Sequence, residues 1–235
     1  MQRINEKFKE LDIIYKNHPL ISFLNDNTKP PLGKLSFIPL LSHFAMSFSD
    51  VNKYCYRDLK SDDIFQKIVN EHTYEDELHS ALFLRDLKHF DCNSPQKFSE
   101  SLTTIWNSNN VNSRKCFYEL VGLLYNAIPI EKYIILESVE RNGNILFKAF
   151  SSIAEELSLV TGNKYVYFGH HHFELESGRA ISELYKANIN YINNYQLNFE
   201  VFTKSCFLID KVYEIFNLFW LDLYNYAANY TNKLT

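Results

Sequence analysis

Glycine and proline are scarce along this chain, with 6 of each among 235 residues. A protein built from many short strands needs frequent turns, and these two residues supply the backbone conformations that most turns use. No segment shows the alternation of apolar and polar residues that marks a half-buried strand. The sequence therefore predicts an all-α protein, a single-domain bundle of about seven or eight helices that spans residues 1–235.

Helical periodicity indicates where these helices lie. Apolar residues recur every three or four positions over long segments that end at polar or proline-containing stretches. The expected helices cover residues 3–24, 35–56, 61–90, 98–106, 113–126, 130–157 and 198–229, and another is expected after residue 169. A break is expected where His18 precedes Pro19, because proline disfavours helical geometry in the residue before it. The polar residues 61–63 are suitable helix N-caps.

Charge and cysteine usage exclude several protein classes. The net charge is -4 with Lys and Arg dispersed, whereas nucleic-acid-binding proteins gather basic residues on one surface, so no nucleic-acid partner is expected. No window approaches the roughly 18 apolar residues of a membrane span, and the N-terminal segment lacks a secretory signal. We therefore expect no membrane association and a cytoplasmic location. The 4 cysteines form no CxxC pair and are expected to be packed thiols.

The segment EHTYEDELH, residues 71–79, concentrates groups that bind metals. On a continuous helix, residues three, four and seven positions apart share a face, so His72, Glu75 and His79 would point the same way. Polar residues inside an otherwise apolar pattern are candidates for a functional site. The alternative is a solvated acidic face, since runs of charge usually lie on the surface.

A second such segment is YFGHHHFELESGR, residues 167–179, which contains three consecutive histidines. His172, Glu176 and Arg179 would share one helix face by the same spacing. His172 is the favoured ligand because Glu176 follows four residues later, and His171 is held in reserve.

Two carboxylates, Glu137 and Glu140, stand one helical turn apart in the strongly apolar segment 130–157. A buried carboxylate is tolerated when it is paired, protonated or bound to a metal ion. Glu137 is the preferred candidate, with Glu140 in reserve. The alternative for Glu140 is a surface ion pair with Arg141 or Lys132.

Histidine and carboxylate ligands without thiolate favour iron or manganese, because structural zinc sites usually contain cysteine. Five or six such ligands would hold two metal ions. A ferritin-type centre requires Glu-x-x-His on two helices. Only Asp76 and His79 approach that spacing here, so this type of centre is disfavoured.

Four segments resemble the haem-oxygenase-like di-iron oxidases and oxygenases, relatives of the TenA and PQQ-synthesis folds. They are HPLISFL (18–24), HTYEDELH (72–79), IILESVE around Glu137 and YFGHHHFELESGR (167–179). The resemblance implies a helical bundle that binds two Fe(II) ions, or manganese, and activates dioxygen. It further implies an oxidoreductase that oxidises a small carboxylate- or amine-bearing substrate, or one of its own side chains.

Carried over by position, the resemblance assigns metal ligation to six residues: His72, Glu75, His79, Glu137, His172 and Glu176. The late motif of the family ends in histidine, where this chain has Arg179. Arginine stays protonated in proteins and cannot bind a cation. Arg179 would then hold a substrate carboxylate or pair with Glu176.

Two other readings compete with the oxidase. Arg179 leaves open a metal-poor relative that acts as a binding or interaction protein. A TenA-like hydrolase would need a nucleophile, and Cys116 and Cys206 have no evident neighbouring base. The apolar stripe of residues 198–229 is read as core or as the contact of a homodimer.

Overall fold

The computed structural model describes residues 1–90, 95, 97–170 and 183–231. It confirms the all-α prediction, because within these ranges every regular element is helical. In chain order the elements are α1 (Gln2–Tyr15), α2 (Pro19–Leu24), α3 (Pro31–Lys34), α4 (Ile38–Val51), the π-helix η1 (Asn52–Tyr56), α5 (Ile64–Asp76), α6 (His79–Leu87), α7 (Phe98–Ile105), the 3-10 turn η3 (Ser108–Asn110), α8 (Val111–Leu124), α9 (Pro129–Thr161), α11 (Glu183–Asn194) and α12 (Phe199–Thr231).

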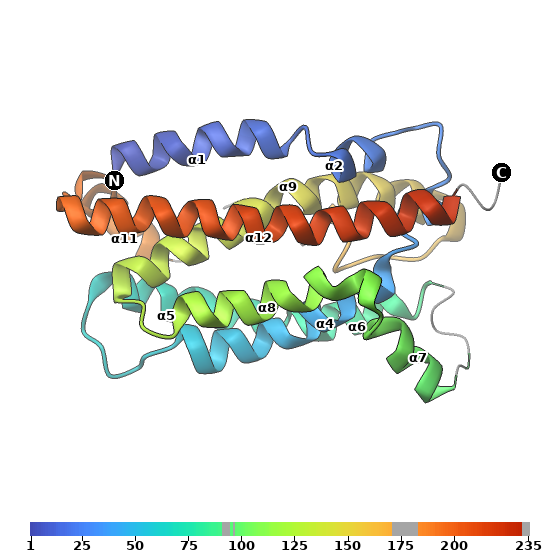
Figure 1. Ribbon diagram of the computed structural model, residues 1–235, viewed down its shortest axis with the longest axis horizontal. Helices are drawn as coiled ribbons and strands as arrows, with labels where there is room; N and C mark the ends of the chain where they lie inside the picture. Colours follow the sequence, from blue (N-terminus) through green and yellow to red (C-terminus); the bar gives the residue numbers. More distant parts are fainter. Residues whose placement is uncertain (91–94, 96, 171–182, 232–235) are drawn as a thin grey trace.

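Two helices of 33 residues each, α9 and α12, run along the length of the bundle and pack against each other. Helix α12 has α1 on one side and α8 on the other, as Figure 1 shows. Helix α5 packs against α9, and α4 contacts both α8 and α6. Antiparallel packing of long helices around shared apolar faces is the usual architecture of such bundles.

A continuous core of aromatic and aliphatic side chains joins these helices. Trp220, Tyr213, Phe8, Phe37 and Phe150 are among its largest members, and each is at most 1% exposed. Burying a large side chain of this kind stabilises the fold by about 1.5–3 kcal/mol. The apolar stripe of α12 thus lies inside the chain's own core, and the homodimer through this helix remains a prediction.

Two local signals in the sequence act as expected. Helix α1 ends before Pro19, and the Nδ1 atom of His18 accepts a hydrogen bond of 3.1 Å from the Leu20 N–H at the start of α2. Asp63 is the N-cap of α5, and its carboxylate accepts hydrogen bonds from two backbone N–H groups of the first turn. Both residues satisfy N–H groups that have no partner within a helix.

The single helix predicted over residues 61–90 was wrong, because α5 ends at Asp76 and α6 begins at His79. Arg57, from the segment before α5, explains the break. Its guanidinium donates to the carbonyl oxygen of Thr73 at 2.8 Å and to the carboxylate of Glu77 at 2.7 Å. A guanidinium that binds the last carbonyl groups of a helix stabilises its end.

Asp86 on α6 holds the segment that follows α9. It is fully buried, and its carboxylate accepts hydrogen bonds of 2.8–3.0 Å from the backbone N–H groups of Val166 and Phe168. Burial raises the pKa of Asp86, while these N–H groups act in the opposite direction. Just beyond, Gly169 lies so close to the chain that a Cβ atom there would be 2.2 Å from the Tyr165 carbonyl oxygen.

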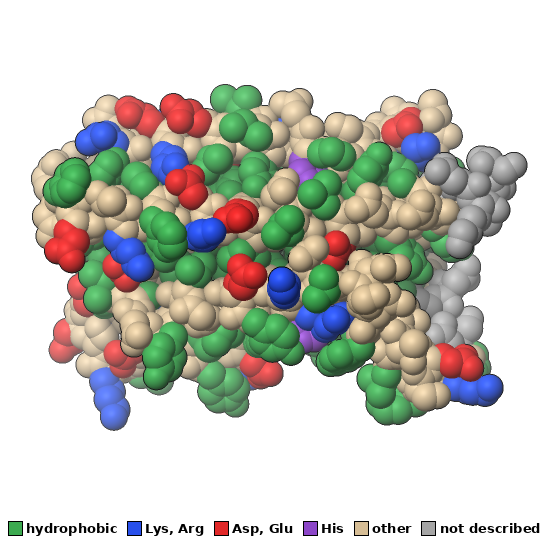
Figure 2. Space-filling model, viewed as in Figure 1, with side chains coloured by type: hydrophobic (Ala, Val, Ile, Leu, Met, Phe, Trp, Pro, Cys, Tyr) green, Lys and Arg blue, Asp and Glu red, His purple; other side chains and the backbone are tan. Residues whose placement is uncertain are grey.

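On the surface drawn in Figure 2, Lys and Arg side chains are interspersed with Asp and Glu. Within the described part of the chain, no helix combines the length and apolar character needed to cross a bilayer.

Candidate metal centre

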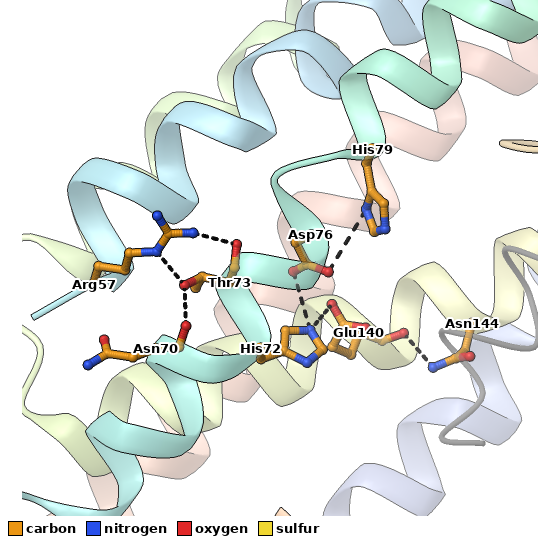
Figure 3. A network of polar contacts seen from close by, with 8 residues as sticks. All are labelled: Arg57, Asn70, His72, Thr73, Asp76, His79, Glu140 and Asn144. Atoms are coloured by element: carbon orange, nitrogen blue, oxygen red, sulfur yellow. Dashed lines mark hydrogen bonds and ion pairs between the residues drawn. The ribbon is translucent and has the colours of Figure 1, made fainter. Parts of the chain in front are cut away.

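Helices α5 and α9 bring together His72, Asp76 and Glu140. His72 and Asp76 lie one turn apart on α5, and Glu140 comes from the facing side of α9 (Figure 3). One potential ligand atom from each residue lies within 4.8 Å of the other two. Among the described residues this is the group of histidine, cysteine and carboxylate side chains that is close enough to share a metal ion.

Two carboxylates converge on one imidazole nitrogen. The Nε2 atom of His72 is 3.2 Å from Oδ2 of Asp76 and 3.2 Å from Oε1 of Glu140. One N–H bond cannot point at both oxygens. Within the described part of the chain, neither Nε2 of His72 nor Oδ2 of Asp76 has a hydrogen bond of good geometry. Asp76 is 2% exposed, so its carboxylate is largely shielded from water. A cation between the three atoms would satisfy all of them.

The electrostatics of the site depend on these same carboxylates. Burial acts to lower the pKa of His72, but Asp76 and Glu140 more than offset it and hold this pKa well above its usual value. Without a metal ion, His72 is therefore an imidazolium flanked by two carboxylates. A metal ion would displace the proton, because histidine binds metals in its neutral form.

His79 joins the edge of this group through the helix break rather than through a continuous helix face. It is the first residue of α6, and its Nδ1 atom is 3.9 Å from Oδ1 of Asp76. Its ring lies parallel to that of Phe48, with ring centroids 6.4 Å apart. The sequence predicted His79 on one continuous helix face with His72, whereas in the structure the break between α5 and α6 brings it to Asp76, and its role as a ligand remains a prediction.

Glu137 lies one turn before Glu140 on α9 and has different partners. Its carboxylate is 3.9 Å from the Arg141 guanidinium and is hydrogen-bonded to Tyr133. Burial raises its pKa, whereas Arg141 and His72 act to lower it. Tyr133 is in turn hydrogen-bonded to Tyr185 of α11. The positive charge of His72 thus affects the pKa of Glu137, although Glu137 is not part of the three-residue group.

Arg141 and Lys132, the cations considered as partners of Glu140, contact other groups in the structure. Arg141 is close to Glu137 instead and binds Asp12 of α1 at 2.8 Å. Lys132 donates to the carbonyl oxygen of Tyr56. The Glu140 side chain is 14% exposed, and its Oε1 atom faces Nε2 of His72.

The sequence pattern favoured Glu75 as a ligand, whereas the structure brings the neighbouring Asp76 to His72. Glu75 is exposed and lies outside the group, whereas the adjacent Asp76 points inward. The signal for Asp76 was its position four residues after His72, a spacing that allows side-chain contact equally well. A choice between neighbouring acids required the rotation of α5 relative to α9. His171, His172, Glu176 and Arg179 lie outside the described residues, and their roles remain predictions.

His43, which the sequence analysis did not select as a ligand, packs among aromatic rings. Its ring centroid is 5.6–5.7 Å from those of Trp106, Phe117 and Tyr118. Burial lowers its pKa. Cys116, considered as a nucleophile, is buried, and burial raises its pKa well above the usual value, which disfavours the reactive thiolate.

Comparison with known proteins gives no independent assignment. No protein-family model matches the chain, and a search of curated proteins finds no match. The resemblance to the haem-oxygenase-like oxidases therefore remains a prediction from the residues named above.

Proposed function

We propose that this chain is a non-haem iron protein that activates dioxygen to oxidise a small carboxylate- or amine-bearing substrate. The observation that carries the proposal is the convergence of the Asp76 and Glu140 carboxylates on Nε2 of His72, each at 3.2 Å, between two helices of a bundle. Bundle cores are a common location for carboxylate-bridged iron centres.

The chemistry of the donors favours this class of metal. One imidazole and two carboxylates form a nitrogen and oxygen set without sulfur, and no cysteine belongs to the group. Such sets suit Fe(II) or Mn(II) better than the thiolate-rich sites of structural zinc. Three protein ligands on one side of an ion leave coordination positions open, and oxygen-activating iron enzymes use such positions.

The described residues support one ion directly. His72, Asp76 and Glu140 would hold it, and His79 is close enough to Asp76 to join after a small movement of its side chain. A second ion would draw on His172 and Glu176, with Glu137 as a further carboxylate. Bound iron would supply the redox chemistry, while the hydrogen-bonded residues Tyr133 and Glu137 would orient the polar groups next to it.

A second candidate function has its own support. The pKa of His72 is raised well above its usual value by Asp76 and Glu140, so the three side chains can exist as a metal-free ion triad. A bundle held together in this way would be a binding or interaction protein without redox chemistry. The oxidase would bind iron at these three residues, whereas the metal-free ion triad would not.

The test is metal content after anaerobic loading with Fe(II), measured by elemental analysis after removal of unbound metal. We expect at least one iron per chain in the wild type, and its loss in His72→Ala and Glu140→Gln. Glu155→Gln is the matched control, since Glu155 is an exposed acid on α9, the helix that carries Glu140. It should retain iron. Oxygen consumption by the loaded protein, measured with an oxygen electrode, then tests the redox function.

Other outcomes would contradict the proposal. A wild type that binds no iron, or variants that retain it, would exclude a metal centre at these residues and favour the ion triad. Stoichiometric iron without oxygen uptake would exclude the oxidase. Arg179→His tests the second ion, since an increase from one iron to two would show that Arg179 prevents its binding.

A further inference from the structure

A cavity of about 780 Å³ lies between the α7–η3 connection and the last turns of α12. Cavities of about 300–1,000 Å³ are typical of sites for small molecules. The cavity contains none of His72, Asp76 or Glu140. Binding of a ligand in this cavity would therefore not depend on the metal centre proposed above.

One wall is a single face of α12. Its members recur every three or four residues and so project from the same side of the helix. They are Asp222, Asn225, Tyr226, Asn229 and Tyr230. Tyr226 and Tyr230 are 37% and 45% exposed, so their rings are half open to solvent.

The opposite wall supplies further uncharged polar groups. Thr103 and Thr104 donate their hydroxyl hydrogens to carbonyl groups of α7, which leaves their oxygens free to accept. Asn110 is 1% exposed, and its Oδ1 atom has no hydrogen-bond partner among the described residues. A buried amide oxygen without a partner costs free energy, and a bound donor would remove that cost.

The charged side chains that line the cavity indicate which class of ligand it can bind. None of its described lining residues is Lys, Arg or His, so an anionic ligand would lack a counter-charge. The carboxylate among these described residues belongs to Asp222, and it already accepts hydrogen bonds from the backbone N–H and side-chain amide of Asn112 at 2.9 and 3.0 Å. Its charge is thus partly satisfied within the protein. A neutral ligand with many hydrogen-bonding groups fits these walls.

We propose that this cavity binds a neutral polyhydroxylated molecule of the size of a mono- or disaccharide. Adjacent sugar hydroxyls both donate and accept hydrogen bonds, and the side-chain amides of Asn225 and Asn229 offer both functions. The C–H face of a sugar ring is apolar and packs against aromatic rings, here Tyr226 and Tyr230. The unpartnered oxygen of Asn110 would accept from a hydroxyl group.

The test is titration calorimetry of the full chain with glucose, N-acetylglucosamine and maltose, and with glucose 6-phosphate and adenosine as comparison ligands. We expect at least one neutral sugar to bind, and the phosphorylated sugar to bind less tightly because the cavity lacks a cationic side chain. The double variant Asn225→Ala/Asn229→Ala should weaken binding about tenfold or more, equivalent to about 1.4 kcal/mol. Both positions are exposed, so the variant should fold normally.

Matched controls separate the cavity from the rest of the surface. Asn190→Ala/Asn193→Ala removes two exposed amides from α11 and should leave the affinity unchanged. Tyr230→Ala should weaken binding, whereas Tyr125→Ala, at an 83% exposed tyrosine elsewhere, should not. The proposal is overturned if no neutral sugar binds, if adenosine binds in their place, or if the α12 variants bind as tightly as the controls.

Discussion

The Nε2 atom of His72 on α5 lies 3.2 Å from Oε1 of Glu140 on α9, and Asp76 approaches the same nitrogen from the next turn of α5. This contact joins two helices that are remote in sequence. It makes the interface between α5 and α9 dependent on charge as well as on apolar packing, and it can be tested without metal.

In metal-free protein, His72 and Glu140 should stabilise the fold through each other. Glu140→Gln should lower the free energy of unfolding by about 1–3 kcal/mol, because the imidazolium loses one of its two carboxylates. A double-mutant cycle with His72→Gln, measured by urea denaturation, should give a coupling energy of about 0.5–3 kcal/mol.

The exposed pair Lys67–Asp62, with oxygen and nitrogen 3.1 Å apart, is the control for this cycle. Its coupling should be below about 0.5 kcal/mol, since exposed ion pairs contribute little. A His72–Glu140 coupling no larger than that of the control would show that the two side chains do not interact in solution.

Asp86 should be essential for the stability of the segment after α9. In Asp86→Asn, one carboxylate oxygen is replaced by an NH₂ group that cannot accept from Val166 or Phe168. We expect a loss of about 2–4 kcal/mol, since hydrogen bonds to charged groups contribute about 1.5–3 kcal/mol each. Thermal or urea denaturation of Asp86→Asn beside the wild type measures this loss of stability. Asp62→Asn, at a fully exposed side chain, should change stability by less than about 0.5 kcal/mol.

Gly169 should tolerate no side chain. The Cβ of Gly169→Ala would lie 2.2 Å from the Tyr165 carbonyl oxygen, so the backbone must shift, at a cost of about 1–3 kcal/mol. Gly122→Ala provides the opposite control, because Gly122 is in α8 with no atom within 4 Å of the new Cβ. That variant should gain about 0.5–1 kcal/mol from the lower backbone entropy of the unfolded chain. Equal effects of the two substitutions would contradict the close approach at residue 169.

Stability should fall in mild acid because of His18. Burial lowers its pKa below the ordinary value of 6.5, and the nearby polar groups of Asn217 oppose this in part. Below pH 6.5 the unfolded chain binds a proton that the folded chain does not. The free energy of unfolding therefore decreases as pH falls, with a slope of at most about 1.4 kcal/mol per pH unit from this group. The contribution is fully present above pH 6.5.

His18→Asn should reduce this pH dependence, since asparagine keeps an N-cap acceptor for the Leu20 N–H but does not titrate. Denaturation at pH 7 and pH 5 measures the difference. Asn17→Ala, at an exposed neighbour of His18 that does not titrate, should leave the dependence close to that of the wild type. If His18→Asn shows the wild-type loss at pH 5, another group is responsible.

The positions of most helices could be predicted because their causes are local. The break before Pro19 and the N-cap at Asp63 each depend on a few neighbouring residues, and the structure has both. The division of residues 61–90 into α5 and α6 could not be predicted, because it depends on Arg57 reaching the Thr73 carbonyl from outside the helix.

The candidate site was predicted as a region but not residue by residue. The segment 71–79 was identified from its density of histidine and acid, and His72 and His79 both lie at the site. Glu75 and Asp76 could not be ranked, since both have helical spacing to His72. The same holds for Glu137 and Glu140 on α9, where the sequence favoured Glu137 and the structure brings Glu140 to His72.

The sequence by itself determined that the chain is helical, where most of its helices begin and end, and which segments carry potential metal ligands. These properties follow from helical spacing, caps and turn residues, which act over a few positions. Only the tertiary structure decided that Asp76 and Glu140, rather than Glu75 and Glu137, face His72. The rotation of each helix about its axis is set by how the apolar faces of α5, α9 and α12 pack, and a turn of about 100° between neighbouring residues separates an inward carboxylate from a solvated one.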